Sequence, residues 1–222
     1  MLAFVPAVDR PLRVALLGAH CDDVEIGCGG LLLDLAARGL LSHADLLVLC
    51  STPERAAESR TSAAAFCSPA PCATTFGGLP DGRLPAHWDQ VKDLLQTFAA
   101  DTDPDLVLAP SPADAHQDHR LVGELVRTAF RDHVVLHYEI PKWDGDLGAG
   151  RPQVYWPLSA DLVARKWELL DEHYPSQRGR DWWRPDTFSS LSRLRGMECR
   201  ADHAEAFAAP ALVLRAGPPA GP

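Results

Sequence analysis

The sequence predicts an α/β fold of three layers, a Rossmann-like sandwich in which helices cover both faces of a mostly parallel sheet. Short apolar runs of strand length alternate with helical stretches over roughly the first 140 residues, and such alternation is typical of a parallel sheet. Clusters of His and Asp follow the first and fourth of these runs. We expect one domain over residues 1–222, with a core at 1–143 that carries the polar clusters and a smaller C-terminal segment at 144–222 that forms a cap and part of the substrate pocket.

The first part of the core begins with a strand at residues 12–19, an apolar run typical of a strand buried on both faces. A helix is expected at 30–39, because leucines and alanines lead to Gly39, a residue suited to a helix C-cap. The second strand is expected at 44–50, and the alanine-rich residues 53–66 are expected to form the second helix.

The second part of the core repeats the alternation. A short third strand at 73–76 precedes a turn, and residues 88–99 carry apolar side chains at helical spacing. Strands at 106–109 and 134–140 flank a helix at 121–130. With a strand order near 3-2-1-4-5, the first and fourth strands are neighbours where the order reverses, which is the point where such sheets bind ligands.

The pattern becomes less regular after residue 141. A loop is expected at 144–152, helices at 160–173 and 187–196, and a last strand at 212–214. Four tryptophans lie in this half and can either stack on a sugar ring or pack in the core: Trp143, Trp156, Trp182 and Trp183.

Composition excludes several classes of protein. The formal net charge of −9 and the isoelectric point near 5.4 argue against nucleic acid as a partner, because backbone binding needs a basic face. The apolar runs have strand length, so no membrane span is expected. The first ten residues lack the basic region of a secretory signal, and the six cysteines form no C-x-x-C pair, so we expect a cytoplasmic protein with reduced thiols. The oligomeric state is open, and a homo-oligomer is compatible with the sequence.

The two polar clusters predict a metal site. His20, Asp22 and Asp23 follow the first strand, and Asp114, His116, Asp118 and His119 follow the fourth. His20 and Asp23 can point at one ion, and the second cluster supplies a further His. Two His and one carboxylate with an open position suit catalytic zinc or non-haem ferrous iron.

Each cluster also has a simpler interpretation. Asp118 can open the following helix as a first-turn acid, and Cys21 is a buried hydrophobe more readily than a ligand. The glycines Gly27, Gly29 and Gly30 are like those of a phosphate-binding turn, but they lack the G-x-G-x-x-G spacing and acidic residues precede them. A metal site formed jointly by the two clusters is the stronger prediction.

The motifs resemble those of the PIG-L (LmbE-like) N-deacetylases. Residues 19–30 resemble that family's AHPDDxExGCGG motif, with Cys21 where proline is usual, and residues 114–119 match its D-x-H-x-D-H motif. The stretch from Arg55 to Glu58 is similar to its R-x-x-E helix, and similar residues fall at 81–82, 176–177 and 204–207.

The resemblance implies a role for each residue. The metal ligands are His20, Asp23 and His119; Asp22 is the general base, His116 stabilises the oxyanion, and Asp118 orients His116. Among less certain positions, Arg55 binds a sugar hydroxyl or phosphate or is a plain surface residue, and Tyr138, with Glu139 and Lys142, is a candidate to line the pocket.

The implied function is removal of the N-acetyl group from an N-acetylated amino sugar or glycoconjugate, with Zn²⁺ or Fe²⁺ as cofactor. Two alternatives are an amidase that acts on a larger N-acyl or thiol-conjugate amide, and a non-catalytic sugar- or nucleotide-binding module. The sequence does not show whether the sugar is free, linked to a nucleotide, or part of an antibiotic or a glycan.

Overall fold

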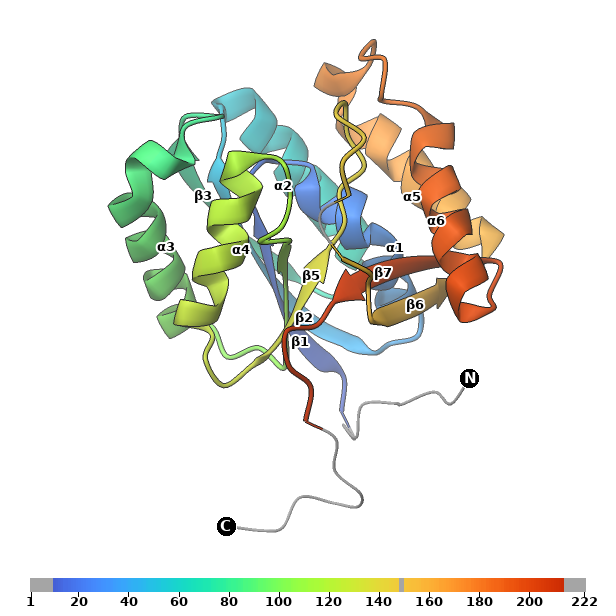
Figure 1. The fold of residues 1–222 in the computed structure, drawn as a ribbon, viewed down its shortest axis with the longest axis horizontal. Coiled ribbons are helices and arrows are strands. Elements are labelled where there is room, and N and C mark those ends of the chain that lie inside the picture. Colours follow the sequence, from blue (N-terminus) through green and yellow to red (C-terminus); the bar gives the residue numbers. More distant parts are fainter. Residues whose placement is uncertain (1–9, 148–149, 214–222) are drawn as a thin grey trace.

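The computed structural model describes residues 10–147 and 150–213 and contains one seven-stranded sheet between helices (Figure 1). The strand order is β3-β2-β1-β4-β5-β7-β6. The strands are β1 (Leu12–Gly18), β2 (Leu41–Cys50), β3 (Cys72–Leu79), β4 (Leu106–Pro110), β5 (Val134–Tyr138), β6 (Val154–Leu158) and β7 (His203–Ala208). The helices are α1 (Asp23–Ala37), α2 (Pro53–Cys67), η1 (Leu84–His87), α3 (Trp88–Asp101), α4 (Gln117–Ala129), α5 (Ala160–His173), η2 (Pro175–Gln177) and α6 (Pro185–Cys199).

The first five strands are parallel and confirm the predicted order 3-2-1-4-5. Alternate side chains of β1 face opposite sides of the sheet. Val14 and Leu16 pack with α1, α2 and α5, whereas Ala15 and Leu17 pack with α3 and α4. The sheet therefore separates two apolar cores, and its central strands are buried on both faces.

The C-terminal segment extends the same sheet with two antiparallel strands. The expected strand at 212–214 is wrong for Leu212 and Val213, which lie outside any strand, and residue 214 is outside the described residues. The last strand is β7, which lies between β5 and β6. Neither β6 nor β7 was expected, because Pro157, alanines and Glu205 have low strand propensity, and tertiary pairing overrides that propensity.

Helix α1 begins at Asp23, seven residues before the expected start, and is bent at Cys28 (φ −143°, ψ 19°). The glycines there serve close packing, because a Cβ at Gly27 would overlap the Tyr138 ring and one at Gly29 would lie 2.6 Å from Phe66. The buried carboxylate of Glu205 accepts the backbone N–H groups of Gly30 and Leu31, each at 2.7 Å. The backbone N–H groups of these two residues, which follow the bend, are therefore both hydrogen-bonded.

Among the described residues, no helix combines the length and apolar character needed to cross a membrane.

Candidate metal centre and cleft

The two predicted clusters meet at the carboxyl ends of β1 and β4, which are adjacent strands paired from Val14 with Leu106 onward. His20 follows β1 directly, and His119 lies in the first turn of α4, which begins after β4. Ninety-nine residues separate them in the chain, yet His20 Nδ1 lies 3.1 Å from His119 Nε2. The sheet topology is therefore what assembles the site.

The side chains of His20, Asp23 and His119 converge, and each of the two facing ring nitrogens lies near a different oxygen of the Asp23 carboxylate. His119 Nε2 lies 3.2 Å from Asp23 Oδ1, and His20 Nδ1 lies 3.6 Å from Asp23 Oδ2. Two ligands bound to a tetrahedral ion at about 2.0–2.1 Å would be about 3.3–3.4 Å apart. The observed spacings fit such an ion.

The outer partners of the two rings strengthen this fit. His119 Nδ1 lies 3.0 Å from Asp114 Oδ2, and His20 Nε2 lies 2.9 Å from Asp81 Oδ1 and 3.2 Å from Asp118 Oδ2. Each ring can donate its outer N–H to a carboxylate, which leaves the lone pairs of His20 Nδ1 and His119 Nε2 facing each other beside Asp23. Facing lone pairs repel, so the point between them needs a cation or a proton.

The titration of these groups follows from the same geometry. Burial lowers the pKa of both histidines, but Asp23 and the outer carboxylates outweigh burial and raise the pKa of His20 well above its usual value and that of His119 to about 9. Burial raises the pKa of Asp23, yet the two histidines hold it well below its usual value. The protein without metal therefore favours positive charge at this point.

Two looser groupings overlap this trio. The ligand atoms of His20, His116 and His119 lie within 4.8 Å of one another, as do those of His20, Asp81, His116 and Asp118. We keep His20, Asp23 and His119 as the candidate ligand set, because the facing nitrogens of the two rings lie 3.1 Å apart and each has an Asp23 oxygen at 3.2 or 3.6 Å.

Asp22 lies beside the trio in the same cleft, and its carboxylate pairs with Arg55. Its Oδ2 lies 3.0 Å from Arg55 Nη2, and Arg55 Nη1 donates to Glu58 at 2.7 Å and to Ser176 at 3.0 Å. Burial raises the pKa of the Asp22 carboxyl, and Arg55 only partly offsets this effect. Arg55 lines the cleft as expected of a pocket residue, but its guanidinium is held by Asp22, Glu58 and the ring of Tyr174, whose centroid lies 5.0 Å away.

The contact predicted between Asp118 and His116 is different in the structure. His116 is the N-cap of α4, and its Nδ1 accepts the backbone N–H of Asp118 at 3.2 Å. The Asp118 carboxylate instead accepts the N–H groups of Gly82 and Leu84 at 2.7 and 3.0 Å and faces His20. Because Nδ1 is an acceptor, Nε2 carries the proton of the neutral His116 ring. Burial, followed by the charge of His119, lowers the pKa of His116 and favours that neutral form.

Tyr138 belongs to the core and not to the pocket. It is 1% exposed, its hydroxyl donates to Leu17 O at 2.6 Å, and its ring packs against Gly27. The expectation that Tyr138 binds substrate is therefore wrong. Its neighbour Glu139 pairs with Arg195, whereas Lys142 lines the cleft.

Asp114 has a larger structural role than the sequence indicated. Its Oδ2 lies 3.0 Å from His119 Nδ1. Its Oδ1 accepts a hydrogen bond from the backbone N–H of His116 at 2.7 Å and lies 2.9 Å from Lys142 Nζ. One carboxylate thus positions both histidines of the second cluster. Its place two residues before the N-cap of α4 was visible in the motif, but its partners were not.

We expect Asp114→Ala to weaken metal binding by about 10- to 100-fold, because His119 loses the acceptor that orients its ring. Competition with a chromophoric chelator measures the dissociation constant of zinc. Asp144→Ala is the matched control, since Asp144 lies 3.4 Å from Lys142 on its other side and is expected to leave zinc affinity unchanged. Equal affinities for the two variants would contradict the role of Asp114.

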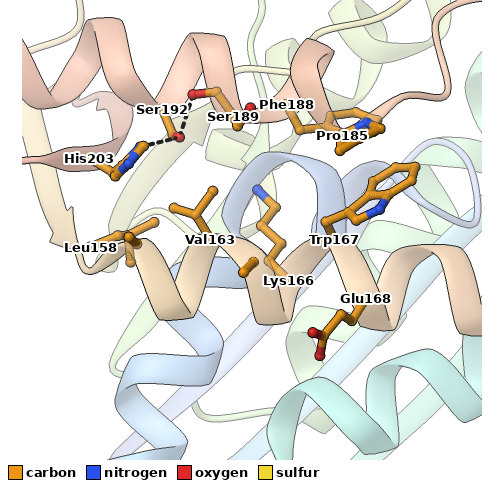
Figure 2. A pocket seen from close by; sticks show the side chains of 12 residues that line it. Leu158, Val163, Lys166, Trp167, Glu168, Pro185, Phe188, Ser189, Ser192 and His203 are labelled. Carbon is orange, nitrogen blue, oxygen red and sulfur yellow. Dashed lines mark hydrogen bonds between the residues drawn. The ribbon is translucent and has the colours of Figure 1, made fainter.

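The trio opens into a cleft of about 450 Å³. His20, Asp22 and His116 line its base, and the C-terminal half adds Trp143, Arg180 and Trp182 to its wall. A second cavity, of about 390 Å³, lies between α5 and α6 near Trp167, Phe188 and His203 (Figure 2). None of the trio lines this second cavity, so we place the chemistry in the first.

The comparisons agree with this arrangement. The family model PIG-L, described as GlcNAc-PI de-N-acetylase, matches residues 15–130, which are 116 of the 222 residues. The chain belongs to the PIG-L family. The match contains both clusters and Arg55, and it ends before the C-terminal wall of the cleft. No curated protein was found to match the chain significantly.

Solved structures share the fold of this PIG-L protein. N,N'-diacetylchitobiose deacetylase from Pyrococcus horikoshii is 18% identical, with a TM-score of 0.68 over 89% of this chain and 83% of that one. The zinc-inhibited form of teicoplanin deacetylase Orf2 is 15% identical, with a TM-score of 0.66 over 88% and 96%. GalB, the 4-carboxy-2-hydroxymuconate hydratase from Pseudomonas putida, is 14% identical, with a TM-score of 0.71 over 92% and 98%. The fold alone therefore does not distinguish deacetylation from hydration.

Proposed function

We propose that this PIG-L family protein is a metal-dependent N-deacetylase that hydrolyses the acetamide of an N-acetylated amino sugar or glycoconjugate. The observation that carries the proposal is a buried carboxylate, Asp22, beside three converging ligand atoms in an open cleft. The activity printed for the family and the names of two structural relatives as deacetylases support the same reaction class.

The ligand set favours zinc, with ferrous iron as the alternative. A divalent ion held by His20, Asp23 and His119 would lower the pKa of a bound water toward about 7 and polarise the acetamide carbonyl.

The residues around the ion would carry the proton transfers. Asp22 accepts the proton of the attacking water and returns it to the amine nitrogen as the C–N bond breaks, which yields acetate and a free amine. Burial raises the pKa of the Asp22 carboxyl above its usual value, which makes the carboxylate a stronger base. His116 donates from Nε2 to the carbonyl oxygen as negative charge develops there. Arg55 holds the Asp22 carboxylate in place.

The test is acetate release from a panel of N-acetylated amino sugars, with the protein loaded with one equivalent of zinc or, without oxygen, of ferrous iron. Excess zinc is avoided because one structural relative was crystallised in a zinc-inhibited form. We expect equal amounts of acetate and free amine from at least one substrate, and loss of both after chelation. Absence of acetate from every substrate with metal bound would favour an amidase for larger acyl groups or a binding module.

A further inference from the structure

The cavity between α5 and α6 is separate from the cleft that holds the metal ligands (Figure 2). Its volume of about 390 Å³ falls within the range of about 300–1,000 Å³ typical of small-molecule sites. Its lining residues lie at 158–203, outside the family match at 15–130, and none of them lines the cleft. The proposed hydrolysis therefore gives this cavity no role.

Most of the cavity wall is apolar and aromatic. Leu158 and Val163 line it, and the rings of Trp167 and Phe188 stack with centroids 5.7 Å apart. Phe188 also contacts the ring of Trp183 edge-on at 5.6 Å, which holds its side chain in place. An apolar ring or chain that enters the cavity removes these side chains and itself from water.

The mouth of the cavity has few side chains that can close it. Ala160, Ala164 and Pro185 line the cavity and are exposed to solvent. Alanine ends at Cβ and the proline ring is rigid, so none of the three can fold across the opening. The fourth exposed lining residue, Glu168, is paired with Arg165 at 3.0 Å. These residues leave a route from solvent into the cavity.

The hydrogen bonds of Ser192 and His203 determine what the polar end of the cavity offers (Figure 2). Ser192 donates its hydroxyl hydrogen to Ser189 O at 2.9 Å, and His203 Nδ1 lies 3.1 Å from Ser192 Oγ. Because Oγ has no second hydrogen, Nδ1 is the donor and Nε2 of the neutral ring is an acceptor. No described residue donates to this Nε2. The polar end therefore favours a ligand that donates a hydrogen bond.

The charges along the cavity are already paired. The buried Lys166 Nζ lies 2.7 Å from Glu205 Oε1 and donates to Ile26 O at 2.6 Å. An ionised ligand would lose its hydration without meeting an unpaired opposite charge. A neutral ligand avoids this loss of free energy.

We propose that the cavity is a second binding site, for a small neutral molecule with an apolar ring or chain and a hydroxyl group that donates to His203 Nε2. The walls at Val163, Trp167 and Phe188 bind the apolar part. The site does not depend on the proposed deacetylation, because no metal ligand lines it.

The binding test uses three compounds that share one apolar body: 4-propylphenol, propylbenzene and 4-propylbenzoate. The metal-loaded protein is titrated with each at about pH 8 by isothermal calorimetry, where a phenol is protonated and a benzoate is ionised. We expect the phenol to bind about three- to tenfold more tightly than propylbenzene, the usual effect of one neutral hydrogen bond, and the benzoate to bind most weakly. Equal affinities of the phenol and propylbenzene, tightest binding by the benzoate, or no binding by any compound would overturn the proposal.

Variants of the lining show where the compounds bind. Val163→Phe fills part of the cavity and is expected to weaken binding of the phenol at least tenfold. Leu162→Phe is the matched control, because Leu162 is the preceding residue of α5 and does not line the cavity, and it should bind as the wild type does. Unchanged binding to Val163→Phe together with weaker binding to Trp143→Phe would place the compounds in the cleft and overturn the proposal.

His203→Leu tests the hydrogen bond and serves as the second variant if Val163→Phe does not fold. We expect this variant to bind the phenol and propylbenzene with equal affinity, because the acceptor is lost and the apolar wall remains. His87→Leu, outside the lining, is expected to keep the preference for the phenol. An unchanged preference in His203→Leu would exclude His203 as the acceptor.

Discussion

Replacement of Asp22 by asparagine is expected to lower kcat by about 10²- to 10⁴-fold, the usual contribution of general acid–base catalysis. Asparagine keeps the shape of the side chain but cannot accept the proton of water or return it to the amine. The fold should tolerate the change, because Arg55 keeps Glu58 as a partner at 2.7 Å. Steady-state acetate release measures the effect.

Metal content must stay constant for this result to concern proton transfer. Asp22 pairs with Arg55 and is not one of the three proposed ligands, so we expect Asp22→Asn to bind the same stoichiometry of zinc as the wild type. Asp89→Asn, at an exposed acid of α3, controls for the loss of one negative charge. A kcat within a few-fold of the wild type would exclude Asp22 as the base.

Replacement of His119 by alanine is expected to abolish zinc binding at micromolar concentrations, an effect larger than the 10- to 100-fold expected from loss of an outer partner. His119 is 2% exposed and supplies one of three ligand atoms. Its loss also removes one of the buried partners of Asp23 and of Asp114, which destabilises the protein. Metal analysis after dialysis gives the stoichiometry, and circular dichroism shows whether the chain is folded.

His119→Gln keeps polar atoms at this position and serves as the second variant if the alanine variant does not fold. His87→Gln is the control, because His87 is bound to Gln90 at the end of η1 and lies outside the cleft lining. Full zinc occupancy in a folded His119→Gln protein with an unchanged dissociation constant would rule out His119 as a ligand.

The sequence was sufficient to predict that the two polar clusters come together, because the patterns that predict the strands are short in range. Apolar runs predicted β1 and β4, and their order in a parallel sheet predicted that the polar residues after each strand meet. His20, Asp23 and His119 do meet, with spacings of 3.1–3.6 Å. The central strands and most helices of the core were found within a few residues for the same reason.

The partners of individual side chains were not predictable in this way. Asp114 and Asp118 are four residues apart, and from the sequence either could contact a histidine of the second cluster. The start of α4 at Gln117 places Asp114 against His119 and Asp118 against His20. Tyr138 lies at a strand end, but its side chain faces the core with Leu136 and under Gly27. Successive residues of a strand point to opposite faces of the sheet, and a continuous apolar run such as β5 does not show which of its residues point to which face.

The sequence by itself determined the class of fold, the two clusters and the kinds of atom that they offer, because each depends on neighbours within one strand or turn. Only the tertiary structure decided which carboxylate holds which ring, that Arg55 is held against Asp22, and which residues after 141 line the cleft. Most of those contacts join segments far apart in the chain: Arg55 and Asp22 are 33 residues apart, and Asp118 and His20 are 98 apart. They depend on how helices and strands pack, and local sequence patterns carry no information about that packing.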